Sequence, residues 1–501
     1  AMRSPDGDHW ASHPPFGVPA AEAVAASADI VNNITNLTGT LRFFKARLPG
    51  AKAQFVSQFT ITCSRHNCKG VRAASPVWYT GLVSASWGIL PPLGKRYAMI
   101  GISKLYCGTV EASDPLRYGR RSEDLPSHLL QFSADKKPVV VWNVGRRCNL
   151  RCVHCYSHSR DQHYSGELSH DEGLRLIDDL ARFGVPVLLF SGGEPLMRPR
   201  LFELIGRARD AGLRAVISTN GTLITPEIAA GLKEFGLSYV GVSLDGLEET
   251  NDRFRGVKGA FAAALEGIRN CRSAGIKVGL RFTINRRNAQ DIDGIFDLLI
   301  AEQIPRVCFY HLVYAGRGSK LVGEDLDREQ SRRVVDLIID RTAQAHSSGV
   351  PLEVLTVDNH CDGPYLYLRM LREHREQAAG VLELLRMNGG NSSGVGIGCV
   401  SWDGSVHADQ FWRHYSFGNV RERPFSEIWM DTSDPLMARL KDRKPHLKGR
   451  CGACKWLDIC NGNFRVRAEA VTGDAWAPDP ACYLTDAEIG ICERRQGFPQ
   501  A

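Results

Sequence analysis

Three cysteines lie close together with the spacing Cys148-x3-Cys152-x2-Cys155, directly after a predicted strand. Three thiolates on one short loop can bind three corners of a [4Fe–4S] cube and leave the fourth iron open for an exogenous ligand. Clusters that only transfer electrons usually have four cysteine ligands. The spacing therefore predicts a cluster that takes part in chemistry, and a zinc knot is the alternative that the same residue types allow.

A glycine-rich turn with the sequence Ser-Gly-Gly-Glu-Pro follows at residues 191–195. Glycines let the backbone approach a ligand closely, and backbone acceptors together with Glu194 can bind an ammonium group. Two further polar turns follow later strands, at residues 218–221 (Ser-Thr-Asn-Gly) and 243–246 (Ser-Leu-Asp-Gly). Polar turns after successive strands indicate a ligand site at the strand ends.

A second group of cysteines has the spacing Cys451-x2-Cys454-x5-Cys460 and is followed by Cys482. These four thiolates make a complete set for a second [4Fe–4S] cluster. Zinc in a four-cysteine site is the alternative, because the spacing suits it as well. Cys399 is a further candidate ligand whose role the sequence leaves open. The following cysteines are predicted to be core or surface thiols: Cys107, Cys271, Cys308, Cys361 and Cys492.

Short apolar runs alternate with helical stretches from residue 138 onward. The predicted strands cover residues 139–144, 187–190, 214–218, 239–244, 278–284 and 306–312, and the predicted helices cover residues 170–183, 201–211, 226–235, 260–274 and 292–302. Six such repeats predict an α/β fold with parallel strands and crossover helices. An open six-stranded barrel and a doubly wound sheet both fit, and both gather ligands at the carboxyl ends of the strands.

The remaining segments suggest the domain organisation. Residues 1–98 show little periodicity, so we expect a poorly ordered or non-native extension and an enzyme that begins near Met99. We then expect a lead-in segment (99–137), a barrel (138–326), a helical bridge with a flexible glycine-rich connector (327–398), an auxiliary-cluster domain (399–492) and a tail (493–501). The bridge helices are predicted at residues 327–349 and 366–386.

Composition narrows the function classes. Of the 501 residues, 43% are apolar and 23% charged, which excludes a disordered chain and a polytopic membrane protein. Residues 73–94 are uncharged, but prolines leave no stretch long enough to span a membrane. The net charge is +7, and residues 1–98 alone hold 10 basic and 4 acidic residues. We therefore expect no nucleic-acid partner, and the cysteine clusters favour a reducing, cytoplasmic compartment.

Residues 138–312 resemble the radical S-adenosylmethionine (SAM) superfamily, through the three-cysteine loop and the polar turns that follow it. The resemblance implies a partial (β/α)6 TIM-like barrel, a [4Fe–4S] cluster on Cys148, Cys152 and Cys155, and bound SAM. The residues that it assigns to SAM binding are Gly192, Gly193, Glu194, Pro195, Ser218, Asn220, Ser243, Asp245, Arg255 and Arg281. His154 departs from the pattern, because the family more often has an aromatic residue before the third cysteine.

The second cysteine group resembles SPASM, an auxiliary-cluster domain of many radical SAM enzymes. The resemblance implies a second [4Fe–4S] cluster on Cys451, Cys454, Cys460 and Cys482. The full domain has seven cysteines and two clusters, but here Phe464 and residues 408–409 (Ala-Asp) replace expected cysteine positions. We therefore expect one auxiliary cluster.

Residues 99–130, 139–157 and 402–429 resemble radical SAM enzymes of the alternative heme pathway. This resemblance implies an iron tetrapyrrole substrate, a small redox protein as electron donor, and loss of two acetate side chains from 12,18-didecarboxysiroheme to give Fe-coproporphyrin III. Heme d1 maturation, or oxidative decarboxylation of Fe-coproporphyrin, is the alternative within the subfamily. Outside the subfamily, a SPASM-type peptide-modifying enzyme and an iron–sulfur electron carrier stay open.

An iron tetrapyrrole presents carboxylates, a flat apolar face and a metal. Its carboxylates would suit arginine side chains, and the candidates are Arg255, Arg281, Arg286, Arg287 and Arg317. An imidazole could bind the iron, with His311, His360, His407 and His414 as candidates. Trp402, Phe411, Trp412 and Tyr415 are candidates for the ring face, although a small hydrophobic core of the C-terminal domain is the favoured explanation for them. No residue is assigned to the chemical step itself.

Overall fold

The βα repeats build one curved parallel sheet in the computed structural model, which describes residues 99–109 and 137–491. Its central strands are β2 (Val139–Gly145), β3 (Val187–Gly192), β4 (Arg214–Thr219), β5 (Tyr239–Ser243), β6 (Val278–Ile284) and β7 (Arg306–His311). They pair in parallel in chain order. A doubly wound sheet reverses its strand order part-way, and this order does not, so the open-barrel prediction is confirmed. The expectations for residues 1–98, for residues 110–136 of the lead-in segment, for Cys492 and for the tail at residues 493–501 fall outside the described residues.

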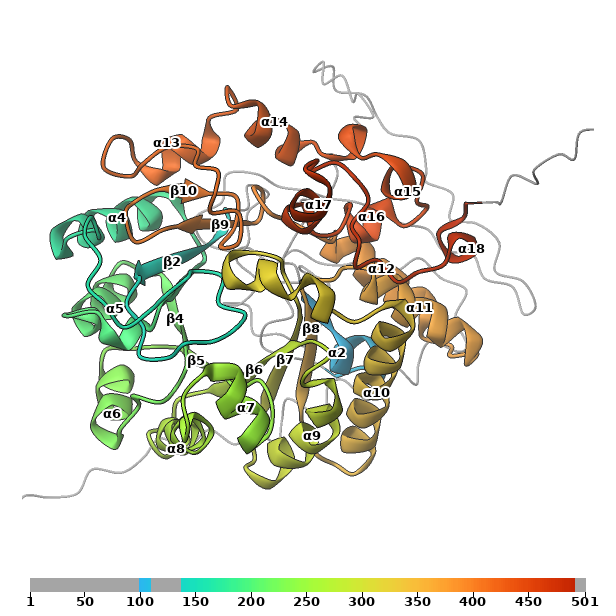
Figure 1. Cartoon of the computed structure of the whole chain (residues 1–501), viewed down its shortest axis with the longest axis horizontal. Coiled ribbons are helices and arrows are strands. Elements are labelled where there is room, and N and C mark those ends of the chain that lie inside the picture. The colour runs from blue at the N-terminus through green and yellow to red at the C-terminus, as the bar shows by residue number, and fades with distance from the viewer. Residues whose placement is uncertain (1–98, 110–136, 492–501) are drawn as a thin grey trace, which may run out of the picture. The chain divides into compact units, whose positions relative to one another are not determined.

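Crossover helices cover the outside of the strands, as Figure 1 shows. They are α4 (His170–Phe183), α5 (Leu201–Asp210), α6 (Pro226–Glu234), α7 (Glu248–Arg255), α8 (Ala260–Ser273) and α9 (Ile292–Ala301). Local sequence fixes their starts: Ser169 and Glu172 form a capping box at α4, and Thr225 caps α6 ahead of Pro226. Helix α7 was not predicted, because its eight residues include only one large apolar side chain, Phe254.

Four further strands extend the sheet at both edges. β8 (Glu353–Val357) adds in parallel to β7, and β1 (Met99–Gly101) pairs antiparallel with β8 ahead of α2 (Ile102–Cys107). At the other edge β9 (Ile397–Val400) adds in parallel to β2, and β10 (Val406–His407) pairs antiparallel with β9. The sheet order is β1-β8-β7-β6-β5-β4-β3-β2-β9-β10.

The bridge was predicted to be rich in helices, and it also contains a strand, β8, that the sequence analysis did not predict. Its helices α10 (Arg328–Ser347), α11 (Asp362–Arg372) and α12 (Ala378–Asn388) are present, but β8 lies between α10 and α11. The strand is only five residues long, and a short apolar run shows no clear periodicity in sequence. Its neighbours in the sheet determine its structure.

The glycine-rich connector is also different from the prediction of a flexible segment. Asn391, Ser392 and Ser393 are buried. Arg443 donates to the Asn391 side chain and to the Ser393 carbonyl. The Gly390 α-carbon lies so close to Cys460 that a β-carbon there would be 2.3 Å from the Cys460 carbonyl oxygen. The segment is therefore an ordered part of the packing around the second cysteine group.

Short helices and turns make up the C-terminal region. The helices are α13 (Phe425–Met430), α14 (Pro435–Lys441), α15 (Gly449–Gly452), α16 (Leu457–Cys460), α17 (Arg465–Thr472) and α18 (Asp486–Ile489). This region also contains the 3-10 turn η7 (Lys444–His446). Earlier in the chain lie the 3-10 turns η4 (Pro195–Met197), η5 (Ala289–Asp291) and η6 (Gly316–Glu324). Within the described ranges, no helix has the length and apolar character needed to cross a membrane.

Candidate functional site

A cavity opens at the carboxyl ends of the parallel strands. It contains about 1040 Å³ of space between atoms, part of which is open to solvent. The predicted residues that line it are Cys148, Cys152, Cys155, Gly192, Gly193, Ser218, Asn220, Ser243, Arg255 and Arg281. The sheet thus brings together side chains from five successive strand ends.

The loop that follows β2 holds the three cysteines in place. Its backbone amides at Arg151 and Val153 donate to the carbonyls of Arg255 and Phe254, at 3.0 Å each. The Arg317 guanidinium donates to the Cys152 carbonyl at 2.7 Å. Burial raises the pKa of Cys148 to about 12. Iron binding would therefore displace a proton from this thiol.

The glycines of the turn at residues 191–195 are needed for contact between backbones. A β-carbon on Gly192 would lie 2.3 Å from the Gly145 carbonyl oxygen, and one on Gly193 would lie 2.2 Å from that of Arg147. The Gly193 amide donates to the Gly145 carbonyl at 2.8 Å. The end of β3 is thereby joined to the start of the cysteine loop.

Glu194 faces the end of β4. Its carboxylate accepts hydrogen bonds from the Thr219 hydroxyl at 2.6 Å and from the amides of Asn220 at 2.8 Å and Leu196 at 3.1 Å. The side chain is 2% exposed, and burial raises its pKa. Glu194 and Pro195 do not line the cavity, so direct binding of an ammonium group by Glu194 stays a prediction.

Asp245 and Arg255 form a buried ion pair beside the cysteine loop. Asp245 also accepts from the Thr283 amide at 2.6 Å, and it lies behind the cavity wall. Arg255 donates to the Cys152 sulfur at 3.5 Å. The geometry gives Asp245 the role of orienting Arg255 toward the cluster loop.

His154 takes the place of the aromatic residue that the superfamily pattern favours. Its ring stacks on Phe254 with centroids 4.6 Å apart. Burial lowers the pKa of His154 to about 4, so the ring is neutral at physiological pH. The departure therefore preserves aromatic packing next to the cysteines.

The far wall of the cavity comes from β6, β7 and the end of β8. Arg281 stacks on the Tyr310 ring at 4.4 Å, and His311 is hydrogen-bonded to Asp362 at 2.9 Å. Asp358 follows β8 and lines the cavity, and burial raises its pKa to about 7. Sequence reasoning missed Asp358 because it missed the strand that positions it.

The remaining candidate residues for substrate binding lie in different parts of the structure. Arg286 and Arg287 are surface residues near η6, and Arg287 pairs with Glu324. His360 is buried outside the cavity lining, and burial lowers its pKa to about 3. His407 contacts Ser401 and Tyr415, and His414 contacts Glu469. Of the candidate histidines and aromatic residues, only His311 and Phe411 line the cavity.

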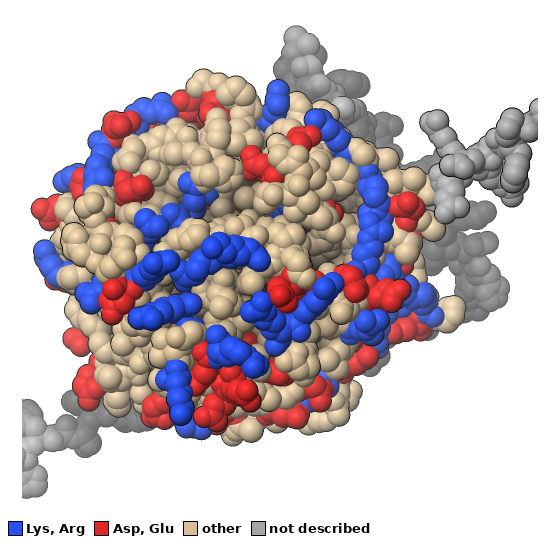
Figure 2. Space-filling model, in the orientation of Figure 1, with Lys and Arg blue, Asp and Glu red and all other residues tan. Residues whose placement is uncertain are grey.

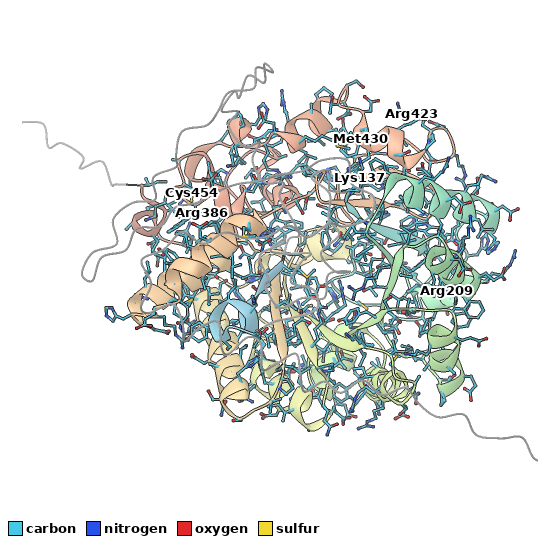
Figure 3. The ribbon with its side chains drawn as sticks, turned by 180° about the vertical axis from the view of Figure 1, so that it is seen from behind. Lys137, Arg209, Arg386, Arg423, Met430 and Cys454 are labelled. Atoms are coloured by element: carbon cyan, nitrogen blue, oxygen red, sulfur yellow. The ribbon has the colours of Figure 1, made fainter. Side chains whose placement is uncertain are left out.

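The second cysteine group surrounds its own smaller cavity of about 430 Å³. Cys451, Cys454, Cys460 and Cys482 all line it, and so does Cys361, which was predicted to be an ordinary core or surface thiol. Figure 3 shows Cys454 in the C-terminal region near α12, which contains Arg386. Cys399 lies elsewhere, on β9, where the Asn143 amide contacts its sulfur at 3.4 Å.

A buried hydrogen-bonded chain runs between the two cavities. His311 contacts one oxygen of Asp362, and the Tyr483 hydroxyl donates to the other at 2.6 Å. Tyr483 directly follows Cys482. The chain thus connects the wall of the large cavity to the second cysteine group.

Comparison with known families decides the identity of this arrangement. The model of the radical SAM superfamily matches residues 142–299, and that of an iron–sulfur cluster-binding domain, SPASM, matches residues 396–455. The Fe-coproporphyrin III synthase of Methanosarcina barkeri is 72% identical over 398 residues, which are 79% of this chain and 100% of that protein. The chain belongs to the radical SAM superfamily.

Further radical SAM proteins are similar over most of the same region. The pre-heme d1 synthase of Dinoroseobacter shibae is 46% identical over 357 residues, which are 71% of this chain and 88% of that protein. The SAM-bound crystal structure of SuiB from Streptococcus suis superposes with a TM-score of 0.56 at 18% identity, covering 69% of this chain and 77% of SuiB. The structural similarity to SuiB shows a shared fold.

As a radical SAM protein with a SPASM domain, the chain binds a [4Fe–4S] cluster and SAM, and its SPASM domain binds auxiliary iron–sulfur clusters. The donor sets fit these groups: three cysteines line the cavity at the strand ends, and five thiols line the smaller cavity. Among residues 99–109 and 137–491, no three His, Cys, Asp or Glu side chains are arranged to hold a single metal ion.

Proposed function

We propose that this radical SAM enzyme removes two acetate side chains from 12,18-didecarboxysiroheme to give Fe-coproporphyrin III in siroheme-dependent heme biosynthesis. The observation that supports the proposal most is the 72% identity to a Fe-coproporphyrin III synthase over that protein's full length. The large cavity at the strand ends, with Arg281 and His311 in its wall, suits a carboxylated iron tetrapyrrole.

We propose that Cys148, Cys152 and Cys155 hold the cluster at which SAM is cleaved. A cluster bound there would supply the electron for reductive cleavage of SAM, which is the source of the radical chemistry. Arg255 donates to the Cys152 sulfur and keeps that ligand oriented. The turns at residues 192–193, 218–220 and 243 line the space next to the cysteines, where SAM would bind.

The rest of the cavity wall orients the substrate and excludes water. Val141, Leu189, Leu312 and Val313 contribute apolar surface, which limits stray proton and hydrogen donors near a radical. A small redox protein is the proposed electron donor, in the cytoplasm. Cys451, Cys454, Cys460 and Cys482 are the proposed ligands of one auxiliary [4Fe–4S] cluster.

The test is anaerobic turnover of the reconstituted enzyme with reductant, SAM and 12,18-didecarboxysiroheme. We expect 5′-deoxyadenosine together with a tetrapyrrole of the mass of Fe-coproporphyrin III. The C148A/C152A/C155A variant is expected to abolish both products and to lower the iron content from about eight to about four per chain.

Each competing reaction gives a different result. Unchanged tetrapyrrole with active SAM cleavage would contradict the proposal. Loss of carbon dioxide from propionate groups of Fe-coproporphyrin would indicate the oxidative decarboxylation instead. The fold is shared with a SAM-bound structure of SuiB, but that similarity does not bear on the substrate.

A further inference from the structure

Two arginines share one tryptophan next to the large cavity. The guanidinium carbon of Arg413 lies 4.2 Å from the Trp402 ring centroid, and that of Arg146 lies 4.9 Å from it. Arg146 also lies 4.6 Å from the ring centroid of Tyr164. Arg146 directly follows β2, whereas Arg413 comes from the C-terminal region after β10. The fold therefore brings two cations from distant segments to one aromatic ring.

These guanidinium groups have no acidic partner in the described part of the chain. The Nε atoms of Arg146 and Arg413 are buried without a hydrogen-bond partner. Arg413 donates to the Tyr156 carbonyl at 3.2 Å. The nearby carboxylate of Glu167 accepts from the main-chain amide of Arg146 at 2.7 Å. Neither arginine forms an ion pair with it.

The like charges are unfavourable without an anion. Burial lowers the pKa of Arg413, and the positive charge of Arg146 lowers it further. Stacking on Trp402 occupies the flat faces of both groups and leaves their N–H edges for a ligand. The N–H edge of a guanidinium group matches the planar, bidentate geometry of a carboxylate.

The pair lies beside the cavity but is not part of its lining. Tyr156, Gln410 and Phe411 line the cavity, and Arg413 is bonded to the first of them and lies close in sequence to the other two. The Gln410 side-chain oxygen is buried without a partner. Figure 2, in the orientation of Figure 1, shows Lys and Arg side chains across the middle of the face that it presents.

We propose that Arg146 and Arg413 form a subsite that binds a side-chain carboxylate of the iron tetrapyrrole. The identity of the ligand rests on the proposed function, whereas the site itself rests on the two unpaired guanidinium groups. Trp402 acts as a positioning residue that holds both cations at one place. Because the subsite lies next to the cysteine loop, it fixes which edge of the substrate faces the SAM site.

The test measures binding of Fe-coproporphyrin III to the cluster-loaded enzyme by titration of its Soret absorption. For R146Q and R413Q we expect the Kd to rise about 10-fold each, with a larger rise for the double variant and a weaker dependence of binding on salt. R413K keeps the charge but loses the planar fork, so its Kd should rise less than that of R413Q. The tetramethyl ester of the same porphyrin should bind wild type and double variant equally.

Arg209→Gln is the matched control. Arg209 is an exposed arginine on α5, paired with Asp210, and Figure 3 shows it in the outer helix layer. Its loss should leave the Kd unchanged. Folding and cluster loading of R146Q and R413Q are verified by iron content and by far-ultraviolet circular dichroism.

The outcomes separate the two proposals. Tight binding by wild type with equal binding by R146Q/R413Q would overturn the subsite and leave the proposed function standing. Absence of tetrapyrrole binding by cluster-loaded wild type would overturn the proposed function and the assigned ligand together. An equal loss of affinity for the acid and for its tetramethyl ester would assign the arginines a structural role.

Discussion

Cys361 is the side chain whose place in the structure most changes the interpretation of the second cysteine group. It lines the same cavity as the four predicted ligands, and its thiol donates to the Asn359 side chain at 3.0 Å. The pKa of Cys482 is lowered to about 7, chiefly by a hydrogen bond from the Cys361 thiol. A cubane takes four thiolates, so one of these five thiols is a neighbour of the cluster and not a ligand.

We expect Cys361→Ala to keep the auxiliary cluster and Cys482→Ala to lose it. In the C148A/C152A/C155A background, iron should stay near four per chain for C361A and fall toward zero for C482A. Iron and sulfide analysis with electron paramagnetic resonance of the reduced cluster measures this. C271A, which removes a buried thiol of α8, is the control. The reverse pattern of iron loss would make Cys361 the fourth ligand.

Asp358 is a buried carboxylate in the wall of the large cavity. Burial raises its pKa to about 7, opposed by the charges of Arg467, Arg281 and His311 and supported by Asp409. An aspartate in an unfolded chain titrates near pH 4. Because its folded pKa is the higher one, its contribution to stability is complete below pH 4 and is lost as the pH rises to about 7.

Asp358→Asn should therefore become more stable relative to wild type as the pH rises from about 4 to about 7. The difference in unfolding free energy should change by on the order of 1–4 kcal/mol over that window and then level off. Asparagine also accepts the left-handed backbone conformation, φ 65°, at this position. Urea unfolding at several pH values measures the difference, and a pH-independent difference would contradict the assigned pKa.

The junction between β3 and the cysteine loop shows how elements of secondary structure position the site. The register of β2 and β3 shifts between Asn143 and Gly145, just before the loop begins. Gly193 lies against the backbone of the loop, and the Glu194 amide donates to the Arg147 carbonyl at 2.8 Å. The cysteines therefore depend on close backbone contact between two strand ends.

Gly193→Ala should displace the loop, because a β-carbon there would lie 2.2 Å from the Arg147 carbonyl oxygen. We expect loss of about four irons and of SAM cleavage, with the auxiliary cluster retained. Gly380→Ala on α12 is the control, since a β-carbon there meets no atom within 4 Å. Full cluster loading in G193A, with normal SAM cleavage, would refute the assigned role of this contact.

The C-terminal region and the barrel are held together by buried charges. Arg467 and Asp479 form a bidentate ion pair at 2.8 and 2.9 Å, and both side chains are 0% exposed. Arg467 also donates to the carbonyls of Leu312 at 3.0 Å and Asp358 at 2.9 Å. One guanidinium thus joins α17 to the ends of two barrel strands.

Arg467→Met should destabilise the protein by about 3–5 kcal/mol, because it leaves Asp479 buried without its partner. Arg333→Met on α10 removes an exposed ion pair with Glu329 and should cost less than about 1 kcal/mol. Urea unfolding of both cluster-loaded variants measures the two effects. A loss below about 1 kcal/mol for R467M would show that this pair does not hold the two regions together.

Local sequence sufficed to predict the six parallel strands, most of their helices and both cysteine groups. Apolar periodicity, helix caps and cysteine spacing depend on near neighbours in the chain, so they can be recognised in the sequence without a structure. The same reasoning missed β8 and β9, whose short runs become strands only because exposed edges of the sheet are there to pair with them.

Long-range packing determined the rest of the site. The sequence could name Cys361, Asp358 and Arg413, but no spacing rule relates them to residues far away in the chain. Curvature of the sheet brings Asp358 into the cavity wall, the fold of the C-terminal region sets Cys361 beside Cys482, and Trp402 brings Arg413 to Arg146. The chemistry was thus readable from residue types along the chain, whereas the neighbours that tune it follow from contacts that only folding creates.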